Sequence, residues 1–226
     1  MNKSMLVGAV LGAVGVTAGG AVATYSLVDR GPDYAEVLAV TPINETVKTP
    51  REVCQDVTVT RYATFGDVVS YCRLSANPVG RLMLHLFGVT DRQSMAMSDG
   101  ICTALQLVNF LQDVAVDWQK GRVYLPQSAL AQYGLTEDAI ARGDTGGLWG
   151  VMMRDQVRRA RQFLAAGAPL GKRLPGRFGL ELRLIVLGGE TILRKLHRSG
   201  GDVFQQRPVL TTRDWLYMGY RALLGR

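Results

Sequence analysis

The chain has 226 residues, 47% hydrophobic and 20% charged, an ordinary composition for a globular protein with a sizeable core. Three widely spaced cysteines without a CxxC pair argue against a cysteine metal site or nucleophile. Residues 1–60 hold four Lys/Arg and six Asp/Glu (net −2), whereas residues 61–226 hold 22 and 13 (net +9), so the second part suits an anionic substrate, an anionic membrane surface or nucleic acid.

The first segment, residues 1–28, is apolar and rich in glycine and alanine. After Lys3 it carries no charge, which is typical of a signal peptide or a single membrane helix. The small residues at 21–23 favour a cleaved signal and export. Glycines at positions 8, 12, 15 and 19 instead favour a membrane helix, because they form one flat face for packing in lipid. Both interpretations stay open; an anchor would place the rest of the chain at the cytoplasmic side of the inner membrane.

Residues 29–60 are predicted to form an irregular linker. Prolines 32, 42 and 50 interrupt short β-prone pieces such as VLAV and VTVT, so the stretch is too broken to build a core. Up to about residue 60, the apolar leader and the piece TPREVCQDV resemble the start of bacterial glycine-zipper envelope proteins. The glycine-rich zipper of those proteins does not follow here.

From Arg61 to the end the pattern is helical, and no strand alternation of useful length is present. Two helices are expected to be bent at Asn77-Pro78, because proline disfavours an α conformation in the residue before it. Ser94 or Ser98 is expected to cap the next, long helix. The other expected helices are around 128–133, from 136 onward, at 148–166, at 180–196 and at 213–223. The second part is therefore predicted to be all-α.

The central stretch, Ile101 to Pro126, is predicted to be one long helix that ends in a basic turn, Lys120-Gly121-Arg122. Most of its circumference is apolar, which predicts a buried helix. Its polar residues are spaced by three, four and four positions and so share one face: Gln106, Asn109, Asp113 and Asp117.

Two carboxylates one turn apart on a buried helix repel each other and lose hydration, so a cation or a proton must compensate them. Matching arginines or a solvated surface are the ordinary explanation for such a pair. The amides that extend the same face favour a cavity, where Asp113 and Asp117 can bind Mg²⁺ together with substrate phosphates. The basic turn lies beside them and can meet a diphosphate.

The motif QLVNFLQDVAVDWQKGRVYLP resembles the second aspartate-rich motif of the squalene/phytoene synthase family. The upstream YCRLSANPVG resembles the tyrosine-containing helix of that family. The forms YCRLSANPVGRLMLHL, DVAVDWQKGRVYLP and LELRLIVLGG are most similar to its hydroxysqualene synthase branch, in bacterial hopanoid biosynthesis. The resemblance covers about residues 61–226 and implies a helical bundle of the isoprenoid-synthase type.

The resemblance also implies roles for individual residues. Asp113 and Asp117, with Asn109, would bind Mg²⁺ against the diphosphate of presqualene diphosphate, and Gln106 would line the same cavity. Tyr71 would assist departure of diphosphate or handling of the carbocation, and Arg122 would bind the leaving diphosphate. A core tyrosine and a helix C-cap are the structural alternatives for the last two residues. The implied reaction converts presqualene diphosphate to hydroxysqualene.

Other site classes find little support in the sequence. No P-loop and no GxGxxG motif is present, so no reductant site is predicted. The arginines at 154, 158, 159 and 161 lack interleaved aromatic residues, so no nucleic-acid site is predicted.

The first aspartate-rich motif of the family is not found in residues 1–60, where its N-terminal helices are expected. One carboxylate pair cannot readily surround a diphosphate with metal ions, so we predict little or no turnover. The rival interpretation is a membrane-anchored envelope or interaction protein that carries a non-catalytic helical remnant.

Overall fold

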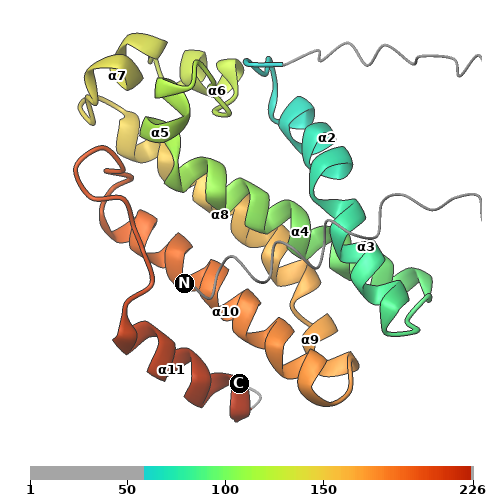
Figure 1. Ribbon diagram of the computed structural model, residues 1–226. Helices are drawn as coiled ribbons and strands as arrows, with labels where there is room; N and C mark the ends of the chain where they lie inside the picture. Colours follow the sequence, from blue (N-terminus) through green and yellow to red (C-terminus); the bar gives the residue numbers. More distant parts are fainter. Residues whose placement is uncertain (1–58, 225–226) are drawn as a thin grey trace, which may run out of the picture. The chain divides into compact units, whose positions relative to one another are not determined.

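The computed structural model describes residues 59–224, which lie within the unit Gln55–Arg226 (Figure 1). The predicted segment 1–28 and the predicted linker 29–60, except for its last two residues, lie outside the described residues. The helices of the described part are α2 (Phe65–Ser75), α3 (Asn77–Leu86), α4 (Arg92–Gln112), α5 (Val114–Gln119), α6 (Gln127–Gln132), α7 (Glu137–Arg142), α8 (Trp149–Gly167), α9 (Leu170–Arg173), α10 (Gly176–Arg198) and α11 (Thr212–Leu223).

The all-α prediction is confirmed for this part of the chain. Its one β-type contact is an isolated parallel bridge between Arg61 and Val123. Between residues 59 and 224, no helix is both long and apolar enough to cross a bilayer.

Two predicted helix boundaries were wrong. Helix α4 begins earlier than expected because Asp91, and not Ser94 or Ser98, is its N-cap: the Asp91 side chain accepts a hydrogen bond from the Ser94 backbone N–H at 2.9 Å. Both serines are buried within α4. The break between α2 and α3 falls at Ala76, and Pro78 lies in the first turn of α3, where a missing N–H leaves no helical hydrogen bond unmade.

Helix α4 is the centre of the fold. It runs beside α8, with α2 and α3 on one side and α10 on another, and α11 lies on the outside of α10 (Figure 1). Its core-facing side chains are buried against apolar side chains of α8 and α10. The largest group of buried residues includes Ala104, Leu107, Leu111, Met152, Val157, Ala160, Leu164, Leu193 and Leu196.

Glycine allows α4 and α8 to approach closely near one end of their contact. A Cβ atom on Gly167 would lie 2.5 Å from the Met97 backbone oxygen and 2.9 Å from the Ile101 backbone nitrogen. Backbone atoms cannot move aside as a flexible side chain does, so a larger residue at position 167 must separate the two helices.

We therefore expect Gly167→Ala to lower the free energy of unfolding by about 1–3 kcal/mol, because it overpacks this contact. Gly219→Ala is the matched control, since a Cβ atom at this helical position meets nothing within 4 Å. The control should change stability by no more than about 1 kcal/mol, and in the stabilising direction. Urea denaturation followed by circular dichroism measures both. Equal effects of the two changes would contradict the close-packing argument.

Candidate active site

The predicted long helix is interrupted at the first aspartate of the motif. Helix α4 ends at Gln112, α5 begins at Val114, and Asp113 between them has φ −108° and ψ 16°. The hydrogen-bond ladder nevertheless continues, from the Asp113 N–H to the Asn109 carbonyl at 2.9 Å and from the Asp117 N–H to the Asp113 carbonyl at 2.8 Å. The prediction of one unbroken helix was wrong, while the one-turn spacing of the two carboxylates holds.

A tight reversal follows α5. Gly121 has a positive φ of 72°, and the Arg122 N–H donates to the Asp117 carbonyl at 2.9 Å. The chain then returns so that the Val123 N–H donates to the Thr60 carbonyl at 2.9 Å. The predicted basic turn therefore directly follows the carboxylate motif, and the Arg122 backbone N–H closes the end of α5.

Asp113 is neutralised by an arginine that no sequence motif indicates. Arg207 Nε donates to Asp113 Oδ1 at 2.5 Å, and this contact raises the pKa of Arg207. Arg207 lies in the connection between α10 and α11, 94 residues further along the chain. No local sequence pattern connects two residues so far apart, which explains why the pair was not predicted.

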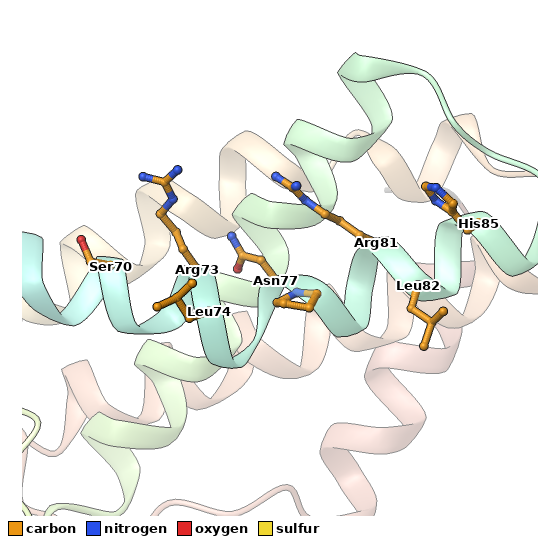
Figure 2. Close-up of a pocket in the computed structure, with 8 residues that line it drawn as sticks. Ser70, Arg73, Leu74, Asn77, Arg81, Leu82 and His85 are labelled. Atoms are coloured by element: carbon orange, nitrogen blue, oxygen red, sulfur yellow. The ribbon is translucent and has the colours of Figure 1, made fainter. Parts of the chain in front are cut away.

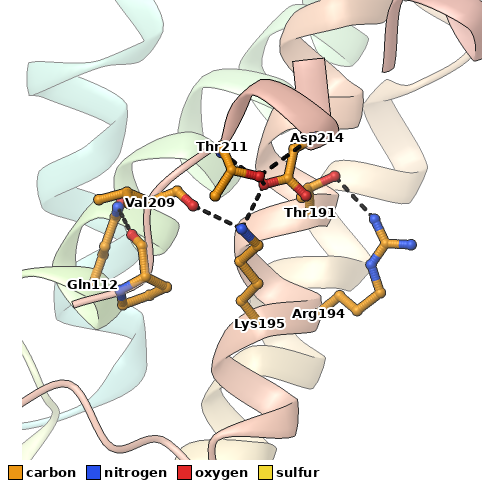
Figure 3. A network of polar contacts seen from close by, with 8 residues as sticks. Gln112, Thr191, Arg194, Lys195, Val209, Thr211 and Asp214 are labelled. Atoms are coloured by element: carbon orange, nitrogen blue, oxygen red, sulfur yellow. Dashed lines mark hydrogen bonds and ion pairs between the residues drawn. The ribbon is translucent and has the colours of Figure 1, made fainter. Parts of the chain in front are cut away.

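The connection that carries Arg207 is held in place by further polar contacts. Gln112 Nε2 donates to the Pro208 carbonyl, and Lys195 Nζ donates to the Val209 carbonyl at 2.8 Å (Figure 3). Lys195 also forms an ion pair with Asp214 at 2.5 Å. Arg207 is therefore positioned by contacts to α4, α10 and α11.

Asp117 differs from Asp113 because it has no such partner. Its side chain is buried, and its Oδ2 atom has no hydrogen-bond partner among the described residues. Burial, and then the negative charge of Asp113, raise the pKa of Asp117, while Lys120 and Arg122 act in the opposite direction. A buried carboxylate oxygen without a partner is unfavourable, so this position is suited to an added cation.

Tyr71 lies in a cluster of aromatic rings against the end of α4. Its ring centroid is 5.6 Å from Tyr62, 6.0 Å from Tyr124 and 6.1 Å from Phe110. Phe110 and Tyr124 stack at 3.8 Å with an interplanar angle of 5°. This cluster of four rings presents several π-faces in one place, which favours a nearby cation.

The aromatic cluster and the carboxylates are electrostatic neighbours. Burial raises the pKa of Tyr124, with contributions from Tyr71 and Asp117, and Arg122 lowers it. Burial also raises the pKa of Tyr62 to about 12, and the buried Tyr62 hydroxyl finds no hydrogen-bond partner in the described part of the chain. Sequence reasoning missed Tyr62 and Tyr124, although Tyr124 belongs to the same GRVYLP piece as Arg122.

An apolar groove of about 540 Å³ runs along α4 beside α10 and α11. Asn109 is exposed and lines this groove, so it connects the groove with the carboxylate face. Gln106 is half-buried on α4. The groove is lined by Leu105, Val108, Asn109, Gln112, Glu181, Leu184, Ile185, Gly188, Gly189, Ile192, Leu210, Trp215 and Met218.

A second groove, of about 740 Å³, lies on the outer face of α2 and α3 (Figure 2). Arg73, Arg81 and His85 line it together with exposed apolar side chains. Arg81 is paired with Asp99 through two contacts of 2.8 and 2.5 Å. None of the predicted site residues lines this groove, so the candidate chemistry belongs to the carboxylate end of α4.

The carboxylates that follow α4 could supply part of the ligand set of a magnesium ion. Asp113 and Asp117 supply hard oxygen ligands one turn apart, and the Asp117 Oδ2 atom accepts no hydrogen bond from the described residues. No group of three or more His, Cys, Asp or Glu side chains with metal-ligand placement exists within residues 59–224. Mg²⁺ that keeps waters and takes phosphate oxygens from a substrate needs only one or two carboxylates from the protein.

Comparison with known proteins relates this chain to one enzyme family. A family model described as squalene/phytoene synthase matches residues 50–214, a range that includes part of the predicted linker. Hydroxysqualene synthase of Rhodopseudomonas palustris is 38% identical over 171 residues, 74% of this chain and 57% of that protein. Phytoene synthase 2 of Zea mays is 38% identical over 115 residues, 48% of this chain and 28% of that protein.

Solved structures give the same picture of the fold. The squalene synthase HpnC from Alicyclobacillus acidocaldarius matches with a TM-score of 0.61 and 38% identity, over 63% of this chain and 54% of that chain. A dehydrosqualene synthase solved in complex with a ligand matches with a TM-score of 0.61 at 18% identity, which concerns the fold alone. The chain thus spans 28% and 57% of the two curated relatives named above.

The raised pKa of Asp117 predicts a pH-dependent effect of its replacement. A raised pKa means that the folded protein favours the protonated carboxyl, so wild type loses stability as pH rises through that pKa. In EDTA, Asp117→Asn should therefore exceed wild type in unfolding free energy by about 1 kcal/mol at neutral pH. This difference in the free energy of unfolding should vanish below pH 3.8, the ordinary pKa of an aspartate carboxyl.

Chemical denaturation across this pH range measures the effect. Asp138→Asn is the matched control, because Asp138 is exposed in the first turn of α7, and it should show no such pH-dependent gain. An Asp117→Asn protein that is less stable than wild type at neutral pH would show that the carboxylate is compensated within the fold.

Proposed function

The chain belongs to the squalene/phytoene synthase family of isoprenoid biosynthesis, and from this premise we propose that it converts presqualene diphosphate to hydroxysqualene with release of diphosphate. The proposal takes its substrate from the resemblance to hydroxysqualene synthase. It is carried by one observation: the buried, unpartnered Asp117 oxygen lies one turn from Asp113, just past the helix whose Asn109 and Gln112 line an apolar groove.

Mg²⁺ is the cofactor in this proposal, and Asp113 and Asp117, with Asn109, are the residues that would hold it. When bound, the ion neutralises charge that develops on the leaving diphosphate. Asp113 is already in an ion pair with Arg207. To hold the metal as well, its carboxylate would have to interact with the guanidinium and the ion at the same time. Arg207 can also turn toward a diphosphate, since its side chain is partly exposed.

The chain's own residues have three tasks in this reaction. Arg122 and Arg207 bind the departing diphosphate by charge-assisted hydrogen bonds. Tyr71 and the rings around it stabilise positive charge on the substrate carbon skeleton through their π-faces. The apolar walls of the groove, with Leu105 and Ile192 among them, hold the prenyl chain and keep bulk water away until a single water molecule adds to the carbocation. That water supplies the hydroxyl of hydroxysqualene and releases one proton, while the C–O bond to diphosphate is the bond that breaks.

A non-catalytic protein is the second candidate, and a specific observation favours it. Asp113 is already paired with Arg207. Residues 1–60 contain no first aspartate-rich motif that would supply carboxylates on the opposite side of the diphosphate. For this reason we propose slow turnover at best. In the second candidate the helical part is a folded remnant in a membrane-anchored envelope or interaction protein.

Diphosphate release from presqualene diphosphate separates the two candidates. The enzyme proposal predicts a Mg²⁺-dependent rate above background in the full chain, and a fall of about 100-fold or to background in Asp113→Asn. Asp138→Asn, an equivalent change at an exposed carboxylate of α7, should keep the wild-type rate. Equal rates in wild type and Asp113→Asn would exclude the enzyme proposal.

The role of Tyr71 is tested by removing only its hydroxyl. If the hydroxyl assists departure of diphosphate, Tyr71→Phe lowers kcat by about tenfold or more. The ring is retained, so the aromatic packing and the stability should change little. If the ring alone acts, by stabilising a cation, Tyr71→Phe keeps the rate whereas Tyr71→Leu loses it. Wild-type kcat in both variants would assign Tyr71 to packing.

A further inference from the structure

Helix α11 has an outer face made of large apolar side chains that lie in solvent. Leu216 is 72% exposed, Tyr220 65% and Leu223 73%. The opposite face of the helix, with Met218 and Ala222, is buried. Side chains of this size rarely stay in water as a continuous helix face, so the outer face of α11 is suited to an apolar partner surface.

The charges around this face are positive. The one acidic residue of α11, Asp214, is held by Lys195 at 2.5 Å and by the Thr211 backbone N–H at 2.7 Å. Arg213 is exposed on the same helix, and the guanidinium groups of Arg194 and Arg221 lie 5.8 Å from the Tyr217 ring centroid. The outer face of α11 consists of leucine and tyrosine side chains bordered by arginines, and its one carboxylate, Asp214, is paired with Lys195. Such a face complements an anionic interface.

The same helix borders the apolar groove. Trp215 and Met218 line the groove, and Trp215 is at the same time 54% exposed. The groove therefore meets the outer surface next to the exposed face of α11. Trp and Tyr are the side chains that favour the boundary between lipid headgroups and hydrocarbon.

We propose that the outer face of α11 docks on the surface of an anionic lipid bilayer, with Trp215 at the boundary and the groove mouth facing the lipid. A bilayer fits better than a protein partner, because the face combines interfacial aromatic residues with arginines and carries no free carboxylate of its own helix. The functional benefit rests on the proposed function: a long prenyl chain dissolves in lipid and can pass from there into the groove.

Fluorescence of the full chain provides the test. Vesicles of phosphatidylcholine and phosphatidylglycerol are prepared with and without brominated acyl chains, which quench tryptophan at short range. Wild type and Trp215→Phe are compared, so that the signals of Trp118 and Trp149 cancel in the difference. Residues 1–58 are the same in both proteins, and any membrane affinity of theirs cancels as well.

The predicted result is quenching of the Trp215 contribution by brominated vesicles, weaker on pure phosphatidylcholine and at high salt. The triple change Leu216→Glu, Tyr220→Glu and Leu223→Glu should remove this quenching and weaken vesicle binding by at least about tenfold. The matched control places three glutamates on the other exposed apolar face, at Leu74, Leu82 and Leu86 of α2 and α3, with the same change in charge.

Three results would overturn the proposal. The first is equal quenching in wild type and Trp215→Phe, and the second is an equal loss of binding in the triple variant and its control. The third is dimerisation through α11 without vesicles, shown by a sedimentation change that the triple variant abolishes. Circular dichroism confirms that each variant is folded. None of these measurements needs turnover, so a failure of the proposed enzymatic function remains distinguishable.

Discussion

The structure depends on how one helix accommodates two carboxylates at its end. Helix α4 is buried along most of its length, and Asp113 and Asp117 follow it at a spacing of one turn. Two negative charges in such a position are unfavourable because each loses hydration and repels the other. The two residues meet this constraint differently, since Asp113 is paired with Arg207 and Asp117 keeps a raised pKa.

This difference connects distant parts of the fold to the site. The connection between α10 and α11 must cross the end of α4 to bring Arg207 to Asp113, and Gln112 and Lys195 hold that connection in place. The same path positions α11 beside the groove that Asn109 lines. The Asp113–Arg207 pair therefore lies on the same connection that leads to a wall of the groove and to the exposed apolar face of α11.

The local parts of this arrangement were predictable from sequence, and the distant parts were not. The 3.6-residue periodicity predicted the helices, and the spacing of Asp113 and Asp117 predicted their shared face. Both predictions rest on residues that are close together in the sequence. The helix break at Asp113 and the cap at Asp91 depend on backbone details that periodicity does not record. Arg207, Tyr62 and Tyr124 reach the site only through tertiary packing, so no spacing rule could have identified Arg207.

The central claim is that the end of α4 requires a cation and an anionic ligand to complete it. Calorimetric titration of the full chain with Mg²⁺ in the presence of inorganic diphosphate tests this claim most directly. The account predicts saturable binding to wild type that is lost in Asp117→Asn, the residue whose carboxylate oxygen lacks a partner among residues 59–224. Binding of equal strength to both proteins, or no binding to wild type, would contradict it.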